Sequence, residues 1–178
     1  KMKRGLVQIY TGEGKGKTSA AIGQAIRARG RGLRILFVQF LKGKEGSGEI
    51  PLLEDVGIKV ICKGEKDKWI FPDRLKEEEK KKIRLEWTHF LDEISRQAKT
   101  EKYDLVILDE INVALYYGLI DKKRLIEFIK SKPTSLEVIL TGRHASPELI
   151  KLAHLVSEIK SIKHPFDTGI KARRGIEY

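Results

Sequence analysis

A glycine-rich stretch near the N-terminus, QIYTGEGKGKTS, carries the clearest chemistry in the sequence, because an apolar segment leads there into a turn ending in Gly16-Lys17-Thr18. Gly12, Gly14 and Gly16 allow positive φ angles and bring backbone N–H groups close to an anion. Lys17 adds a point charge for phosphate oxygens, and Thr18 can ligate Mg²⁺. A helix-compatible run follows and would direct its first N–H groups at the same phosphates. The stretch predicts a phosphate-binding loop (P-loop).

This loop departs from the standard pattern G-x-x-x-x-G-K-S/T, because Thr11 stands at the first glycine position and Gly12 comes one residue late. A glycine-rich turn without function is the plain alternative. The strand pattern before the loop and the helical pattern after it favour phosphate binding. The loop does not specify the reaction, since kinases, motors, switches and transferases all use it.

Two further polar groups follow apolar runs. The segment DLVILDE places Asp109 and Glu110 directly after one run, and Arg143 follows another that ends in Leu140 and Thr141. Ligands bind beyond the carboxyl ends of parallel strands, so we expect the carboxylates to face the P-loop and hold Mg²⁺. Arg143 would neutralise a phosphate at the same edge. Ordinary surface charges after strands are the alternative reading.

Apolar runs alternate with helical patterns along the chain, which predicts one α/β domain over residues 1–178. The expected fold is P-loop NTPase-like (RecA-like), a mostly parallel sheet flanked by helices. Strands are expected at residues 5–10, 33–40, 58–62, 103–108 and 136–140, and helices at 18–29, 83–98, 122–131 and 147–153. The helix at 83–98 has the clearest apolar face, formed by Ile83, Trp87, Phe90, Leu91, Ile94 and Ala98. Residues 41–50 contain three glycines and are expected to form a mobile loop.

Charge and cysteine content limit the binding partners and the site chemistry that can be expected. Lys and Arg number 36 against 25 Asp and Glu, a formal net charge of +11, which suits nucleic acid, an anionic substrate or an acidic protein partner. Charges of both signs are mixed through residues 63–84, which favours a solvated basic surface and makes nucleic acid binding unlikely. The single cysteine, Cys62, lies in an apolar segment and is expected to be a buried structural thiol. His144, His154 and His164 lack metal-ligand spacing and are expected to be structural or contact residues.

The N-terminus has no apolar run of the length that a signal peptide needs, and no segment approaches membrane-spanning length. We therefore expect a cytoplasmic protein without a membrane partner. We also expect Lys1, which precedes Met2, to be a remnant of cloning.

Five motifs in order carry a resemblance over nearly the whole chain: YTGEGKGKTSAA, VQFLKG, VILDEIN with GLI shortly after, TGRHASPELI and KHPFDTGIKARRGIEY. Together they resemble the ATP:corrinoid adenosyltransferases of cobalamin biosynthesis, which act on cob(I)yrinic acid a,c-diamide or cob(I)alamin. The P-loop shares this family's own departure from the standard pattern. The C-terminal motif is not a feature of kinases or motors.

The resemblance implies that ATP binds in a reversed sense and that its 5′-deoxyadenosyl group moves to the cobalt of a Co(I) corrinoid, releasing triphosphate. Co(I) is itself the nucleophile and needs no general base, which agrees with the lack of an obvious Ser/His or Cys/His constellation. The implied catalytic residues are Lys17, Thr18 and Glu110. The implied ATP-binding residues are Gly12, Glu13, Gly14, Lys15, Gly16, Lys17, Thr18, Ser19, Arg27 and Arg143. The implied Mg²⁺ ligands are Thr18 and Glu110, with Asp109 nearby.

The resemblance also implies aromatic side chains that exclude the lower axial ligand of the corrinoid. The matching region reads GEKDKWIFPD, in which Trp69 is the counterpart and Phe71 lies two residues later; the family's second aromatic position holds Asp67. Ordinary packing is the alternative role for both aromatics. His154 and Arg173 replace a usual Asp and a usual Gln. A homodimer and an acidic flavoprotein reductant are the partners implied.

Two other function classes would use the same loop and acidic residues. A RecA-like ATPase would hydrolyse ATP in response to nucleic acid, and a small-molecule kinase would transfer the terminal phosphate to an acceptor hydroxyl. Both would release ADP, and neither accounts for the C-terminal motif.

Overall fold

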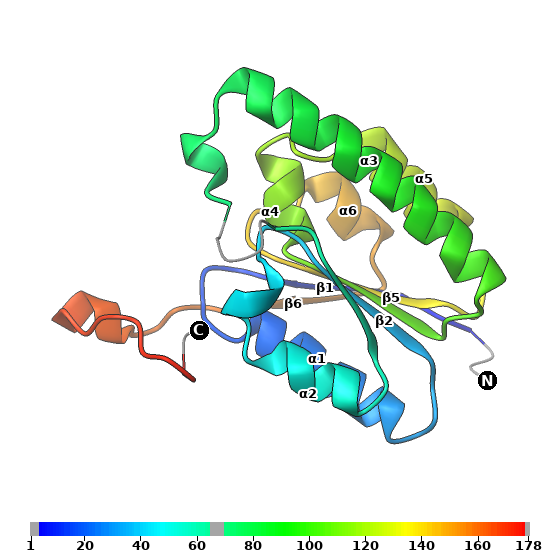
Figure 1. Cartoon of the computed structure of the whole chain (residues 1–178), viewed down its shortest axis with the longest axis horizontal. Helices are drawn as coiled ribbons and strands as arrows, with labels where there is room; N and C mark the ends of the chain where they lie inside the picture. The colour runs from blue at the N-terminus through cyan, green and yellow to red at the C-terminus, as the bar shows by residue number, and fades with distance from the viewer. Residues whose placement is uncertain (1–3, 65–69, 177–178) are drawn as a thin grey trace.

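The computed structural model describes residues 4–64 and 70–176, which form three layers with a parallel sheet in the middle (Figure 1). The described part of the sheet has the order β3-β2-β4-β5-β1-β6, and all its strand pairs are parallel. Its strands are β1 (Val7–Thr11), β2 (Ile35–Gln39), β3 (Lys59–Cys62), β4 (Leu105–Asp109), β5 (Glu137–Thr141) and β6 (Leu155–Glu158). The predicted α/β class with a helix-flanked, mostly parallel sheet is confirmed.

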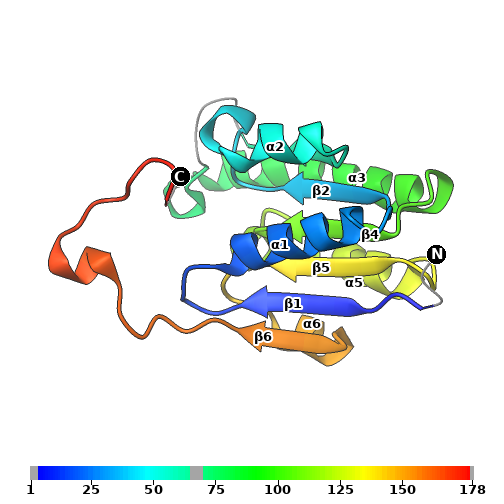
Figure 2. The same cartoon turned by 90° about the horizontal axis from the view of Figure 1, so that it is seen from below.

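Helices cover both faces of this sheet. On one face lie α1 (Lys17–Arg29) and α2 (Glu49–Asp55); the other face carries α3 (Glu77–Thr100), α4 (Ile111–Tyr116), α5 (Lys122–Ser131) and α6 (Pro147–Leu152) (Figures 1 and 2). The described residues also form three short 3-10 helices: η1 (Lys44–Gly46), η2 (Pro72–Arg74) and η3 (Pro165–Thr168). None of the helices within the described ranges is long and apolar enough to cross a membrane.

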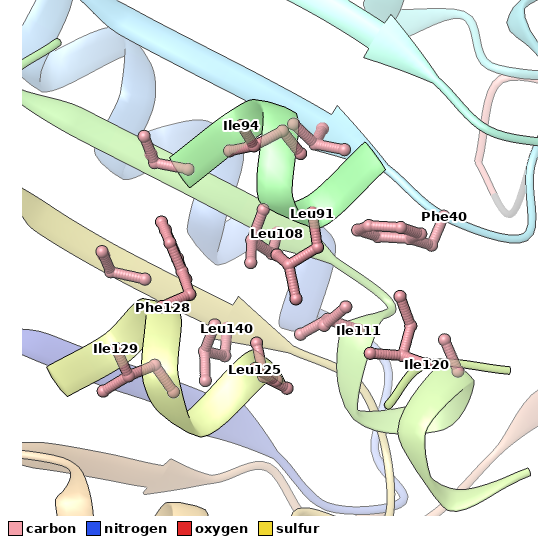
Figure 3. Packing of buried hydrophobic residues seen from close by; sticks show 14 of the residues in the cluster. Phe40, Leu91, Ile94, Leu108, Ile111, Ile120, Leu125, Phe128, Ile129 and Leu140 are labelled. Carbon is pink, nitrogen blue, oxygen red and sulfur yellow. The ribbon is translucent and has the colours of Figure 1, made fainter. Parts of the chain in front are cut away.

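The central strands could be predicted from the sequence because they are buried in the core. Each of β2 and β4 is buried along its whole length, because helices cover both of its faces. Trp87, Phe90, Leu91, Ile94 and Ala98 of α3 are buried, as the periodicity predicted, whereas Ile83 is partly buried. Figure 3 shows the packing of α3 and α5 over the sheet through Leu91, Ile94, Leu108, Leu125, Phe128, Ile129 and Leu140.

The predicted loop over residues 41–50 is confirmed for residues 41–48, which form no strand or α-helix, but its end is wrong, because α2 begins at Glu49. Leu41 and Lys42 are buried, η1 follows, and α2 has begun before Ile50, which is also buried. Two backbone carbonyls of this segment accept hydrogen bonds: Leu41 O from Ile70 N at 2.8 Å, and Lys42 O from Gly64 N at 3.0 Å. Apolar anchors and these bonds order the segment despite its glycines.

Two elements, α4 and β6, were not predicted from the sequence. With only six residues, α4 is too short to show a helical period, and it starts from Glu110 in the left-handed region (φ 60°). The four residues of β6 are all exposed, so its sequence shows no buried pattern. Beyond β6 the chain projects away from the body through η3 (Figures 1 and 2), and its apolar Ile162 and Phe166 are 90% and 73% exposed.

Candidate active site at the carboxyl ends of the strands

The P-loop connects β1 to α1 and rests on the segment that follows β6. Gly14 N donates a hydrogen bond to Ile159 O at 2.7 Å, and a Cβ atom on Gly12 would collide with the same carbonyl. A Cβ on Gly14 would lie 2.7 Å from Lys160 O. Gly12 also has φ 97°, and Gly16, which precedes α1, has φ 121°. The glycines are therefore required for a close backbone approach as well as for the turn.

Lys17 and Thr18 begin α1 and point into the site. Lys17 Nζ donates a hydrogen bond to Gly14 O at 2.6 Å. Burial, followed by the positive charge of Arg143, lowers the pKa of Lys17. Thr18 Oγ1 donates to Asp109 Oδ1 at 2.9 Å, so the P-loop and the acidic strand end are in direct contact.

The acidic pair lies where β4 passes into α4. Asp109 is completely buried and also accepts a hydrogen bond from Thr141 Oγ1 at 2.6 Å. That hydroxyl accepts one from the backbone N–H of Glu110 at 2.9 Å, and β5, which carries Thr141, separates β4 from β1 in the sheet. Burial, followed by the charge of Asp109, raises the pKa of Glu110. The two carboxylates thus form a buried anionic centre next to Thr18.

Lys42, which follows β2, reaches this centre from a third strand. Its Nζ lies 3.9 Å from Asp109 Oδ2 and 3.9 Å from Glu110 Oε1, and its side chain is 11% exposed. Lys42 also opposes the rise in the Glu110 pKa. Gln39 at the end of β2 approaches the far side of Asp109, with Nε2 3.4 Å from Oδ2.

Arg143 approaches from the loop between β5 and α6. Its Nη1 lies 3.1 Å from Glu13 Oε2 of the P-loop, and both side chains are more than half exposed. The preceding residue, Gly142, has φ 119° and packs against the first turn of α4, where Asn112 Nδ2 donates to Gly142 O at 3.2 Å. The next residue, His144, is also left-handed (φ 60°), and its ring stacks on that of Tyr116, with centroids 4.1 Å apart.

These groups surround a cavity of about 730 Å³. The structure places the predicted residues Glu13, Gly14, Lys15, Gly16, Lys17, Thr18, Ser19, Glu110 and Arg143 in its wall. Gly12 directly precedes the wall residue Glu13 in the loop, and Asp109 lies behind the wall, where it accepts the hydrogen bond from Thr18.

Two further predicted residues that the structure describes, Arg27 and Phe71, do not lie in this wall. Arg27 is exposed near the end of α1, ten residues beyond Lys17 and hence about 15 Å further along the helix axis, so the structure does not bring it to the cavity. Phe71 is half exposed, with the Arg74 guanidinium 4.8 Å from its ring centroid. Trp69 and Asp67 lie outside the described residues.

Several residues that form the cavity or support it were not predicted from the sequence. The additional lining residues are Ile22, Lys42, Gly48, Glu49, Leu52, His164, Gly175 and Ile176. Lys42 follows the end of a predicted strand, and the rule that identified Arg143 could have found it. Thr141 ends the apolar run before Arg143, but the sequence did not indicate that its hydroxyl would contact Asp109. The contributions of α2 and of the C-terminal segment depend on tertiary contacts that no local pattern shows.

The remaining predictions on cysteine and histidine have mixed outcomes. Cys62 is partly rather than fully buried, because it ends β3 at the edge of the sheet, and burial raises the pKa of its thiol. His154 Nδ1 accepts a hydrogen bond from Val7 N at 3.1 Å, and His164 Nδ1 accepts one from Phe166 N at 3.2 Å. Both histidines therefore have the structural role expected, as does the stacked His144.

The oxygen atoms in the site fit a magnesium ion. The Thr18 hydroxyl and the two carboxylates are hard ligands of the type that Mg²⁺ prefers. Within the described ranges, no group of three His, Cys, Asp or Glu side chains could hold a metal ion. An ion here would need further oxygen ligands from water or phosphate, as is usual for Mg²⁺ bound with a nucleotide.

Comparisons with known proteins give the family. The model of the family described as ATP:corrinoid adenosyltransferase BtuR/CobO/CobP matches residues 3–178. The corrinoid adenosyltransferase of Escherichia coli (strain K12) is 35% identical over 176 residues, covering 99% of this chain and 87% of that protein. The corrinoid adenosyltransferase of Sinorhizobium sp is 38% identical over 181 residues, covering 99% and 81%. That of Pseudomonas aeruginosa is 35% identical over 181 residues, covering 99% and 85%. The resemblance stated from the five motifs is thereby confirmed, and the chain belongs to the ATP:corrinoid adenosyltransferase family.

Proposed function

We propose that this chain transfers the 5′-deoxyadenosyl group of ATP to the cobalt of a Co(I) corrinoid, releasing triphosphate, in cobalamin biosynthesis or salvage. The observation that carries the proposal is the family match over residues 3–178. The cavity supports it, because a P-loop, two further cations and a carboxylate pair converge where the triphosphate of ATP would bind.

In this reaction Co(I) supplies the electron pair of the new cobalt–carbon bond and becomes Co(III), while triphosphate leaves with the electron pair of the broken C5′–O bond. The protein then has to position C5′ and stabilise the charge that develops on the leaving group. Lys17, Arg143 and the N-terminus of α1 line the cavity and would face this charge. Glu13, paired with Arg143, would yield that arginine to the phosphates.

Thr18, Asp109 and Glu110 would hold Mg²⁺ in this proposal. The bound ion would neutralise part of the polyphosphate charge. Asp109 accepts hydrogen bonds from Thr18 and Thr141. It therefore fixes the direction of the Thr18 hydroxyl, one of the groups that would bind the ion.

The corrinoid side of the proposal concerns the loop that leads into α3. We place Trp69 and Phe71 against the lower face of the corrinoid, where an aromatic side chain would displace the lower axial ligand. Phe71 is half exposed and lies just before η2, so its ring is accessible to a large planar substrate.

The proposed reaction also suggests an electron donor, a cellular compartment and a second copy of the chain as partner. An acidic flavoprotein would supply electrons to the cobalt, and the net charge of +11 suits such a partner. We place the reaction in the cytoplasm, which is reducing and supplies ATP. A homodimer would cover the exposed apolar side chains of β6 and of the segment beyond it.

Analysis of the phosphorus-containing products tests the proposal. The protein is mixed with ATP, Mg²⁺ and chemically reduced corrinoid, and phosphorus NMR is recorded alongside the absorbance of adenosyl-corrinoid. We expect triphosphate and adenosyl-corrinoid in equal amounts. ADP and phosphate as the main products, formed without corrinoid, would instead support a kinase or a nucleic-acid-dependent ATPase.

A further inference from the structure

Lys42 occupies a position that the P-loop chemistry does not by itself explain. Its ammonium nitrogen is equidistant, at 3.9 Å, from one oxygen of Asp109 and one of Glu110. The side chains of Lys42, Asp109 and Glu110 are 11%, 0% and 16% exposed, so solvent screens these charges only weakly. The distances are longer than those of a direct hydrogen bond, and the ammonium therefore acts on the pair mainly through its charge.

Two adjacent buried carboxylates need a nearby cation, because leaving such charges uncompensated is costly. The same two carboxylates are those that would bind Mg²⁺ with Thr18. Lys42 and a divalent ion therefore compete for the same anionic centre, and their charges repel each other at this separation.

We propose that Lys42 is the resident counter-ion of the Asp109–Glu110 pair, and that it transfers to the phosphates of the nucleotide when a divalent cation binds. Lys42 lines the same cavity as the P-loop, so a short movement of its flexible side chain changes its partner from carboxylate to phosphate. Metal and nucleotide then bind together, and the metal alone binds weakly. The inference rests on the proposed function only in taking a polyphosphate as the ligand.

The test uses Mn²⁺ as a paramagnetic substitute for Mg²⁺ and measures its binding by electron paramagnetic resonance, first to the protein alone. Lys42→Met removes the charge and keeps most of the side-chain length. We expect this variant to bind Mn²⁺ at least about tenfold more tightly than the parent protein, because the competing charge is gone. In the presence of inorganic triphosphate we expect the opposite order, with the parent binding the Mn²⁺–triphosphate complex at least about tenfold more tightly.

Two further variants are matched to this experiment. Lys44→Met removes a lysine two residues away, which is 59% exposed and paired with Glu54, and should leave both affinities at the parent values. Lys42→Arg keeps the charge and should restore the parent behaviour. If Lys42→Met does not fold, Lys42→Gln is titrated in its place.

Equal Mn²⁺ affinities for the parent and the Lys42 variant in the absence of triphosphate would overturn the proposal. So would unchanged binding of the Mn²⁺–triphosphate complex. Neither measurement involves a corrinoid or adenosyl transfer, so the inference stands or fails separately from the reaction proposed above.

Discussion

At the scale of single residues, three cations of the site each have a partner within the protein, which the phosphates of ATP would replace in the proposed function. Lys17 donates to a backbone carbonyl of its own loop, Arg143 pairs with Glu13, and Lys42 faces the carboxylate pair. Each of these contacts holds a charged side chain at the cavity wall before the ligand arrives. Such preorganisation lowers the cost of reorganising the site when negative charge develops.

Lys17→Ala should therefore remove most of the activity. Losing one preorganised charge contact typically costs roughly 3–4 kcal/mol, or a factor of about 10²–10³ in rate. The measurement is the initial rate of adenosyl-corrinoid formation at saturating ATP, with Lys44→Ala as a control outside the cavity. A Lys17→Ala rate within about threefold of the parent, against that expected loss, would show that the triphosphate lies elsewhere.

At the scale of elements, α4 links the two sides of the site although it has only six residues. Its first turn follows Glu110, its Asn112 side chain holds Gly142 O, and Tyr116 at its end stacks on His144. Arg143 lies between those two anchored residues. The loop that carries Arg143 is therefore held from behind by α4, and its left-handed residues are supported by these contacts.

Tyr116→Ala should weaken ATP binding through this loop. An aromatic contact of this kind contributes about 0.5–1.5 kcal/mol, so we expect the dissociation constant for ATP to rise by about two- to tenfold. Isothermal titration calorimetry measures it, and Tyr116→Phe, which keeps the ring, should bind as the parent does.

The same change made in an Arg143→Ala background separates positioning from general destabilisation. If Tyr116 acts through Arg143, removing its ring there should have little further effect on ATP affinity. An undiminished effect in that background would mean that the stack does not act through the arginine.

The elements also show what sequence could predict. Strands such as β2 and β4 are continuous apolar runs with both faces covered, and α3 repeats its apolar residues at the helical period, so local patterns were sufficient. The predicted loop over residues 41–50 extends two residues too far, because its glycines gave no sign that α2 begins at Glu49, and the buried Leu41 and Ile50 anchor the segment in the core. The left-handed Glu110 and the approach of Lys42 to the acidic pair depend on long-range contacts, which a local pattern does not contain.

At the scale of the whole molecule, the described C-terminal residues combine a role in the cavity with exposed apolar surface. His164, Gly175 and Ile176 line the cavity at the P-loop, yet Ile162 and Phe166 are among the most exposed apolar side chains of the described chain. Such side chains commonly mark a protein interface. This distribution is the structural reason to expect a second copy of the chain against this segment.

The protein should accordingly sediment as a dimer in analytical ultracentrifugation. Replacing Ile162 and Phe166 together by Glu should shift it to the monomer, because two buried charges would oppose association. Leu85→Glu, at a 64% exposed position on α3, provides a control that should remain dimeric. A parent protein that sediments as a monomer at micromolar concentration would contradict the expectation.

The close approach of Gly12 and Gly14 to Ile159 has a consequence for how the enzyme matures in the cell. The P-loop is translated before the strand and backbone carbonyl that support it, because those belong to residues 155–160, far along the chain from Gly12 and Gly14. A ribosome-bound chain that has emerged only as far as β5 therefore carries the whole nucleotide motif without its supporting strand. Nucleotide affinity should appear only after β6 has left the exit tunnel and joined β1 in the sheet.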